Sequence, residues 1–214
     1  DAIMAFWGAP LHDEQHANHA IAAAIGMLQA LQEVNTAFYQ KGWPRLEIGI
    51  GLNSGEMTVG NMGSAFRMAY TVLGDAVNLG ARLESLSPYY AEPLILSETV
   101  CLAATQYHYR ELDLVRVKGK DAAVRIYAPI LDSAAQIVTS SEAEQQSLHY
   151  AQALLHYREQ HWQEARTAFL DLQSRFGERR IHHIYLARIT ECMSQPPAQG
   201  WQGIHRFDSK QGPA

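Results

Sequence analysis

The side chains of this sequence best suited to chemistry are the amide of Asn78 and the guanidinium of Arg82. They lie four residues apart, so on a helix they project from one face, one turn above the other. A β-branched stretch over 70–73 and a Gly-Asp pair precede them, which predicts a strand, a turn and then a helix. Asp75 occupies the position where an N-cap carboxylate accepts the free N–H groups of a helix. An amide and a guanidinium aimed together off such a helix suit a sugar and a phosphate.

The segment 70–86 closely resembles the signature of the class III nucleotidyl cyclases, which make 3′,5′-cyclic nucleotides from nucleoside triphosphates. Further motifs follow in the family's order, including Gly-Asn-Met-Gly-Ser over 60–64 and Arg-Met-Ala-Tyr-Thr over 67–71. The similarity extends over about residues 1–130, more than half of the chain. The sequence is therefore identified as a member of this adenylate/guanylate cyclase family, of the bacterial adenylate cyclase type.

The resemblance implies a role for each of five residues. Asn78 orients the ribose, and Arg82 stabilises the phosphate in the transition state. Thr71, directly after the tyrosine of the preceding strand, contacts the base, where a threonine favours ATP over GTP. Lys118 in the Val-Lys-Gly-Lys turn contacts the terminal phosphates. Asp1 takes the place of an aspartate that binds both catalytic metal ions.

These roles imply an adenylate cyclase of signal transduction that converts ATP to 3′,5′-cyclic AMP and pyrophosphate. Two divalent ions per site, Mg²⁺ or Mn²⁺, would make the ribose 3′-hydroxyl more acidic and clamp the phosphates. The family takes its metal carboxylates from one subunit and its asparagine and arginine from the other. The resemblance therefore implies a homodimer with composite sites at its interface.

Two residues of the family's pattern, a second metal-binding aspartate and a base-contacting lysine, have no match in this sequence. The apolar pattern over 2–7 predicts a strand that begins directly after Asp1, which also indicates a cut inside a domain. We therefore expect a fragment of a longer parent protein, inactive by itself, with the missing residues ahead of Asp1.

Other functions are compatible with parts of the sequence. A non-catalytic nucleotide-binding or interaction module with the cyclase fold is the main alternative, although the presence of Thr71, Asn78 and Arg82 disfavours it. A di-guanylate-type cyclase is disfavoured because its Gly-Gly-Asp/Glu-Glu-Phe loop is absent. His12, His16 and His19 share one helix face, but no carboxylate or cysteine is patterned with them, so a solvated face is the preferred interpretation.

The composition argues against several classes of binding partner. With 17 Lys and Arg against 22 Asp and Glu, the net charge is −5, and no long basic run indicates a nucleic-acid surface. Cys101 and Cys192 lie far apart and form no metal-ligand spacing. No stretch approaches the roughly 20 apolar residues of a membrane span. We expect a cytoplasmic domain, compatible with a parent anchored to a membrane through an earlier segment.

The pattern along the chain predicts an α+β fold, a ferredoxin-like cyclase sandwich incomplete at its N-terminus, over residues 1–131. We expect a long helix from Asp13 to Gly42, a hairpin of strands 46–52 and 56–60 around Asn-Ser-Gly, and the strand and helix over 67–73 and 75–87. Shorter elements follow in this order: strand 94–96, helix 98–104, and strands 107–114 and 123–127.

The remaining residues predict a second, helical part. A polar linker over 132–147 precedes a segment similar to a tetratricopeptide unit over 148–195, with helices over 148–160, 162–176 and 180–193. Tyr157, Trp162, Ala165 and Phe169 should face inward, and Trp201 should pin a tail over 196–214. Because one such unit rarely buries enough surface to stand alone, we expect it to pack on the cyclase-like domain or on a protein partner.

Overall fold

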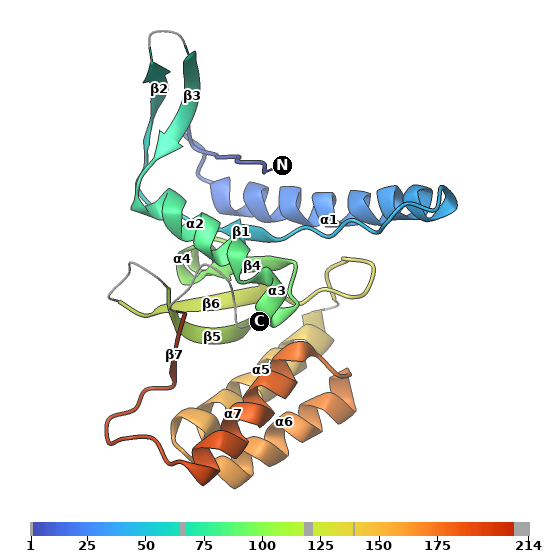
Figure 1. Ribbon diagram of the computed structural model, residues 1–214, viewed down its shortest axis with the longest axis vertical. Helices are drawn as coiled ribbons and strands as arrows, with labels where there is room; N and C mark the ends of the chain where they lie inside the picture. The colour runs from blue at the N-terminus through green and yellow to red at the C-terminus, as the bar shows by residue number, and fades with distance from the viewer. Residues whose placement is uncertain (1, 65–66, 118–121, 139, 208–214) are drawn as a thin grey trace.

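The computed structural model describes residues 2–64, 67–117, 122–138 and 140–207 (Figure 1). Its larger sheet has five strands, in the order β1 (Ile50–Leu52), β4 (Leu94–Ser97), β6 (Val124–Pro129), β5 (Tyr109–Arg116) and β7 (Ile204–Arg206). The pairs β1–β4 and β5–β7 are parallel, whereas β4–β6 and β5–β6 are antiparallel. A separate antiparallel hairpin consists of β2 (Thr58–Ser64) and β3 (Arg67–Leu73). The predicted α+β class is confirmed.

Helices cover both faces of the larger sheet. Strand β4 shows the division, because successive side chains of a strand point to opposite faces. Leu94 and Leu96 pack in one apolar cluster with helices α1 (His16–Gln40) and α4 (Glu98–Ala103). Ile95 packs in the other cluster with the remaining helices, which are α2 (Asp75–Ser85), α3 (Ser87–Tyr90), α5 (Ser140–Arg158), α6 (Trp162–Phe176) and α7 (Arg180–Ser194).

Helix α2 lies directly on strand β1 because a glycine lets it approach. A Cβ atom added to Gly51 would stand 2.2 Å from the carbonyl oxygen of Gly80 and 2.4 Å from the backbone nitrogen of Glu84. The reverse contact is looser, since a Cβ atom at Gly80 would come no closer than 3.8 Å to Gly51. The absence of a side chain at Gly51 therefore sets the distance between α2 and the sheet.

The C-terminal helices share the core of the larger sheet, as expected for a unit too small to stand alone. Tyr157, Ala165 and Phe169 are buried, and Trp162 packs against them half-buried, so the predicted inward face is confirmed. The ring of Trp201 lies 5.2 Å from that of Tyr157 and 5.5 Å from that of Trp162. Beyond Trp201 the chain returns to the sheet as β7, a strand that the sequence pattern does not predict.

A buried polar network also joins the sheet to α7. Asp113 on β5 is 1% exposed, and its carboxylate accepts hydrogen bonds from Tyr90 (2.8 Å) and Tyr185 (3.2 Å). The guanidinium of Arg188 lies 2.7 Å from the same carboxylate. Nearby, Arg110 pairs with Glu92, also out of solvent. The helical part is thus fastened to the sheet by charge as well as by apolar packing.

Two predicted elements are wrong. Residues 2–7 form no strand, and Ile3 is 87% exposed, because no other described segment pairs with them. The hairpin of strands 46–52 and 56–60 is also wrong: β1 begins only at Ile50 and pairs with β4, while β2 pairs with β3. The partner of β1 lies far along the chain, where local spacing does not reveal it, whereas β2 pairs with the strand that follows it directly.

The predicted linker is shorter than expected, because α5 begins at Ser140 instead of at residue 148. Residues 132–138 are folded as well. The Asp132 carboxylate accepts hydrogen bonds from the backbone of Ala134 and Gln136, both at 2.8 Å. The amide of Gln29 on α1 donates to the carbonyl of Ala135 at 3.0 Å. The tetratricopeptide likeness of the helices that follow stays a prediction.

Candidate active site

The site begins at the turn between β3 and α2. Gly74 has φ +148°, a conformation that L side chains rarely adopt, and it is the N-cap residue of the helix. Its carbonyl accepts the first helical hydrogen bond, from the backbone nitrogen of Asn78 at 3.2 Å. Asp75 is therefore the first residue of the helix, and the prediction that it is the N-cap is wrong by one position. Its carboxylate still stands at the positive end of the helix dipole.

Asn78 and Arg82 lie on one face of α2, as their spacing predicts. The opposite face carries Leu79 and Leu83, which are buried against the sheet. Asn78 is exposed, and Arg82 is half-buried. One guanidinium nitrogen of Arg82, Nη1, is buried and has no hydrogen-bond partner among the described residues. A buried cationic donor without a partner is costly, and an anionic ligand would satisfy it.

A set of hydrogen bonds holds the start of α2 in place. The amide of Asn53, just after β1, donates to the carbonyl of Ala76 at 2.9 Å. Thr99 on α4 donates to the carbonyl of Ser54 at 2.8 Å, and the Ser54 hydroxyl lies 2.8 Å from Nε2 of His16 on α1. These residues were not predicted to support the site, because Asn-Ser-Gly is equally typical of a hairpin turn.

His16 is therefore a positioning residue of this network, and the solvated-face interpretation is wrong for its side chain. His19 pairs instead with the carboxylate of Asp13 at 2.8 Å. His12, His16 and His19 do not form a group of possible metal ligands in the described part of the chain.

Thr71 stands on β3 opposite Gly60, two residues before the strand ends at Leu73. It is half-buried. In Figure 1 the β2–β3 hairpin rises away from the larger sheet, and α2 starts directly below it. Thr71 thus lies at the base of the hairpin, on the strand that leads into the helix of Asn78 and Arg82.

A pocket of about 390 Å³ lies beside α2, lined by Leu79, by Asn53 after β1 and by the start of β6. Its charged lining residues are Arg125 and Glu98, which pair at 3.3 Å, and Arg125 also lies 3.7 Å from Glu111. The pocket is thus bounded by the segment that supports α2 and by the strand that follows the predicted phosphate-binding turn.

Lys118 and Asp1 lie outside the described residues. In the parts of the chain that are described, the only group of three possible metal ligands is in the helical part, at His156, Glu159 and His161. The described residues around α2 therefore do not by themselves fit the two catalytic ions.

Comparison with known proteins identifies the family. Residues 1–128 match the sequence model of the adenylate and guanylate cyclase catalytic domain, which is more than half of the chain. The chain belongs to this cyclase family. Adenylate cyclase 1 of Rhizobium meliloti (strain 1021) is 32% identical over 128 residues, which are 59% of this chain and 19% of that protein. The cyclase chain thus spans about a fifth of the length of that relative.

Two solved cyclases share the fold. The crystal structure of the adenylyl cyclase CyaB from P. aeruginosa has a TM-score of 0.54 and 29% identity, covering 59% of this chain and 65% of that one. The guanylyl cyclase Cya2 has a TM-score of 0.51 and 37% identity, covering 57% of this chain and 62% of that one. Because relatives of both specificities are similar, the similarity does not decide the nucleotide. In the described part of this cyclase, no helix combines the length and the apolar character needed to span a membrane.

Proposed function

We propose that this cyclase chain supplies the base, ribose and phosphate side of an adenylate cyclase site that converts ATP to 3′,5′-cyclic AMP and pyrophosphate. In that reaction the ribose O3′ forms a bond to the α-phosphorus, and the bond from that phosphorus to the pyrophosphate oxygen breaks. The observation that carries the proposal is Arg82, whose buried Nη1 has no partner in the described structure and stands one turn from Asn78.

Arg82 would stabilise the charge that develops on the α-phosphate in the transition state. A preformed guanidinium in a partly buried place is effective because it needs no reorganisation during the reaction. Nη1 of Arg82 has no hydrogen-bond partner among the described residues, so it can donate to a substrate phosphate without first giving up such a bond. The backbone position of Arg82 is fixed, since Leu79 and Leu83 hold α2 on the sheet.

Asn78 would hold the ribose so that the 3′-hydroxyl points in line at the phosphorus. An exposed amide can both donate to and accept from a sugar hydroxyl. One helical turn separates Asn78 from Arg82, so the helix fixes the distance between them. Holding reacting groups at a fixed distance can lower the activation barrier substantially.

Thr71 would contact the purine and favour adenine over guanine. This part of the proposal rests on the family resemblance of Arg-Met-Ala-Tyr-Thr and on the position of Thr71 at the base of the hairpin. Lys118 would bind the terminal phosphates, and Asp1 would belong to the carboxylate set for two Mg²⁺ or Mn²⁺ ions. Both of these residues lie outside the described structure.

The proposal includes a homodimer in which each subunit completes the site of the other. Strand β3 carries exposed apolar side chains, with Met68 64%, Tyr70 50% and Leu73 58% exposed. An exposed apolar hairpin is suited to burial against a second subunit. The helices α5–α7 would brace this assembly or recruit a further protein.

The test is a hybrid domain, in which the metal-binding amino-terminal segment of a family member is joined ahead of Asp1. It should make cyclic AMP from ATP with Mg²⁺ or Mn²⁺, and Asn78→Ala should lower the rate by about 10²-fold or more, the scale for losing a group that acts in the transition state. Near-normal turnover in Asn78→Ala would refute its role. Binding of a non-reactive ATP analogue without any turnover would favour a non-catalytic nucleotide-binding module.

A further inference from the structure

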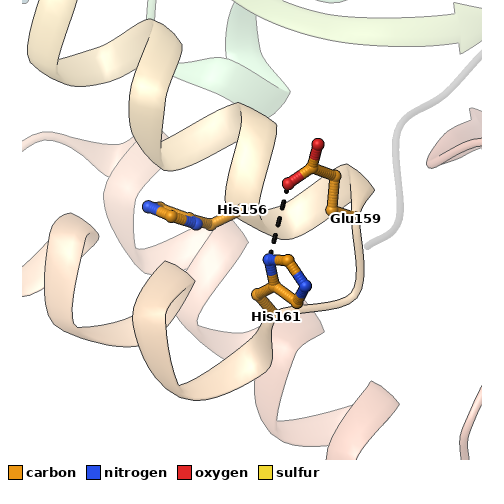
Figure 2. Close-up of side chains that lie close together, drawn as sticks. All are labelled: His156, Glu159 and His161. Atoms are coloured by element: carbon orange, nitrogen blue, oxygen red, sulfur yellow. Dashed lines mark ion pairs between the residues drawn. The ribbon is translucent and has the colours of Figure 1, made fainter.

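The turn between α5 and α6 gathers three possible metal ligands that the cyclase site does not use. His156 lies in the last turn of α5, and Glu159 follows the end of that helix directly. His161 is the N-cap residue of α6. One ligand atom from each lies within 4.8 Å of the others. Figure 2 shows the Glu159 carboxylate and the His161 ring directed at one another, with His156 beside them. Nδ1 of His161 is 3.4 Å from the carboxylate.

The backbone of the turn brings these residues together. Gln160 has φ +62°, which reverses the chain direction immediately after α5. The backbone nitrogen of His161 then donates to the carbonyl of His156 at 2.9 Å. The rings of His156 and His161 consequently lie with their centroids 6.1 Å apart. This reversal places His161, after the turn, opposite His156 and Glu159, before it.

The second observation is a buried nitrogen without a partner. Nδ1 of His156 is buried and makes no hydrogen bond within the described structure. A buried imidazole nitrogen in this state loses the hydrogen bond that it makes with water in the unfolded chain. Glu159 and His161 are exposed, so an ion can reach the group from solvent.

We propose that His156, Glu159 and His161 bind a zinc-class divalent cation. Two imidazoles and one carboxylate are the donor set of three-ligand zinc sites, in which water completes the tetrahedron. Ligand atoms around a tetrahedral zinc ion, at about 2.0–2.1 Å from it, stand roughly 3.4 Å apart. Since the ligand atoms lie within 4.8 Å of one another, their separations need to shorten by at most about 1.4 Å to meet this geometry, and Glu159 and His161 are exposed and able to move.

The donor set separates this site from the catalytic metals of the proposed function, on which it does not depend. Mg²⁺ prefers oxygen ligands, whereas imidazole suits zinc and its transition-metal neighbours. A bound ion would clamp the α5–α6 turn beside the aromatic cluster of Trp162, whose ring is 5.7 Å from Tyr157. The fluorescence of Trp162 and Trp201 should therefore report occupancy.

The experiment titrates the 214-residue chain with zinc sulfate by calorimetry and follows tryptophan fluorescence and thermal unfolding. We expect one zinc ion per chain, and a rise in the unfolding midpoint of roughly 5–10 °C when zinc is 100-fold above its dissociation constant. His161→Ala and Glu159→Gln should each weaken binding by about 100-fold or more, because loss of a supporting residue alone costs about 10–100-fold. Both residues are exposed, so these variants should still fold.

His183→Ala is the matched control, since His183 is also an exposed histidine beside a glutamate, Glu178, at 3.7 Å. Among the described residues this pair belongs to no group of three possible metal ligands. The control variant should bind zinc as the unchanged chain does. Mg²⁺ should give no midpoint shift. The proposal is overturned by undiminished zinc affinity in His161→Ala, or by loss of binding in His19→Ala instead, which would place the ion on α1.

Discussion

Replacing Asp113 by asparagine should release the helical part from the sheet. Asp113 lies on β5, is 1% exposed, and accepts hydrogen bonds from Tyr90 and Tyr185 as well as from Arg188. Burial would lower the pKa of the Arg188 guanidinium, but Asp113 and Tyr185 hold it above its usual value. Asparagine keeps the shape of the side chain and removes the charge, so the buried cation loses its counterion.

The expected loss is about 3 kcal/mol of unfolding free energy. Removing one partner of a buried ion pair costs about 3–5 kcal/mol, because it leaves a buried charge without compensation. The lower end applies here, since the asparagine carbonyl still accepts one hydrogen bond and Arg188 is 12% exposed. Substituting both Asp113→Asn and Arg188→Met should cost less than the sum of the single changes, because no unpaired charge then stays buried.

The assay is equilibrium urea unfolding, followed by circular dichroism and by the fluorescence of Trp162 and Trp201 in the helical part. Asp171→Asn is the matched control: Asp171 pairs with Arg175 at 2.7 Å, but the two side chains are 41% and 56% exposed. That change should cost less than about 0.5 kcal/mol. Equal losses in Asp113→Asn and Asp171→Asn would refute the reasoning that the buried network fastens α7 to the sheet.

Three further changes test other parts of the structure. Gly51→Ala should destabilise the chain by about 1–3 kcal/mol and displace α2, whereas Gly26→Ala, which meets nothing within 4 Å, should be neutral or stabilising in the same urea experiment. Burial, together with the Arg110 and Arg179 cations, lowers the pKa of His182 to about 4, so the unfolded chain binds more protons below about pH 6.5. Stability should therefore fall between about pH 6.5 and about pH 5, by up to about 2 kcal/mol, and less in His182→Gln; an identical pH dependence in both would contradict this. Thr71→Ala in the hybrid domain should lower the ATP/GTP preference, and an unchanged ratio would remove Thr71 from the base pocket.

Local sequence signals predict the elements around the candidate site well. The strand and helix on either side of Gly74 follow from β-branched residues, a glycine and a helical spacing that lie within one short segment. The long helix α1 and the helices α6 and α7 follow from their apolar period, and so does α5 except for its first two turns. In each case the information lies within a few turns of the chain.

Contacts between distant segments are the part that local patterns do not predict. Strand β1 pairs with β4, and β7 pairs with β5. In both pairs the strands lie far apart in the sequence, so the residues around each strand do not predict its partner. The support of α2 by Asn53 likewise depends on a fold-level contact between β1 and the helix. The sequence around Asp113 has an ordinary strand pattern and does not predict that its carboxylate is buried. The structure explains the burial, because Tyr90, Tyr185 and Arg188 donate hydrogen bonds to it.

The most direct test of the proposed function is the rate of cyclic AMP formation from ATP by the hybrid domain carrying Arg82→Ala. Arg166→Ala, an exposed arginine on α6, is the control for removal of a cation elsewhere. The proposal predicts that Arg82→Ala lowers the rate by about 10²-fold or more and that Arg166→Ala leaves it unchanged. Equal rates in the two variants, with both folded, would contradict the assignment of Arg82 to the transition state.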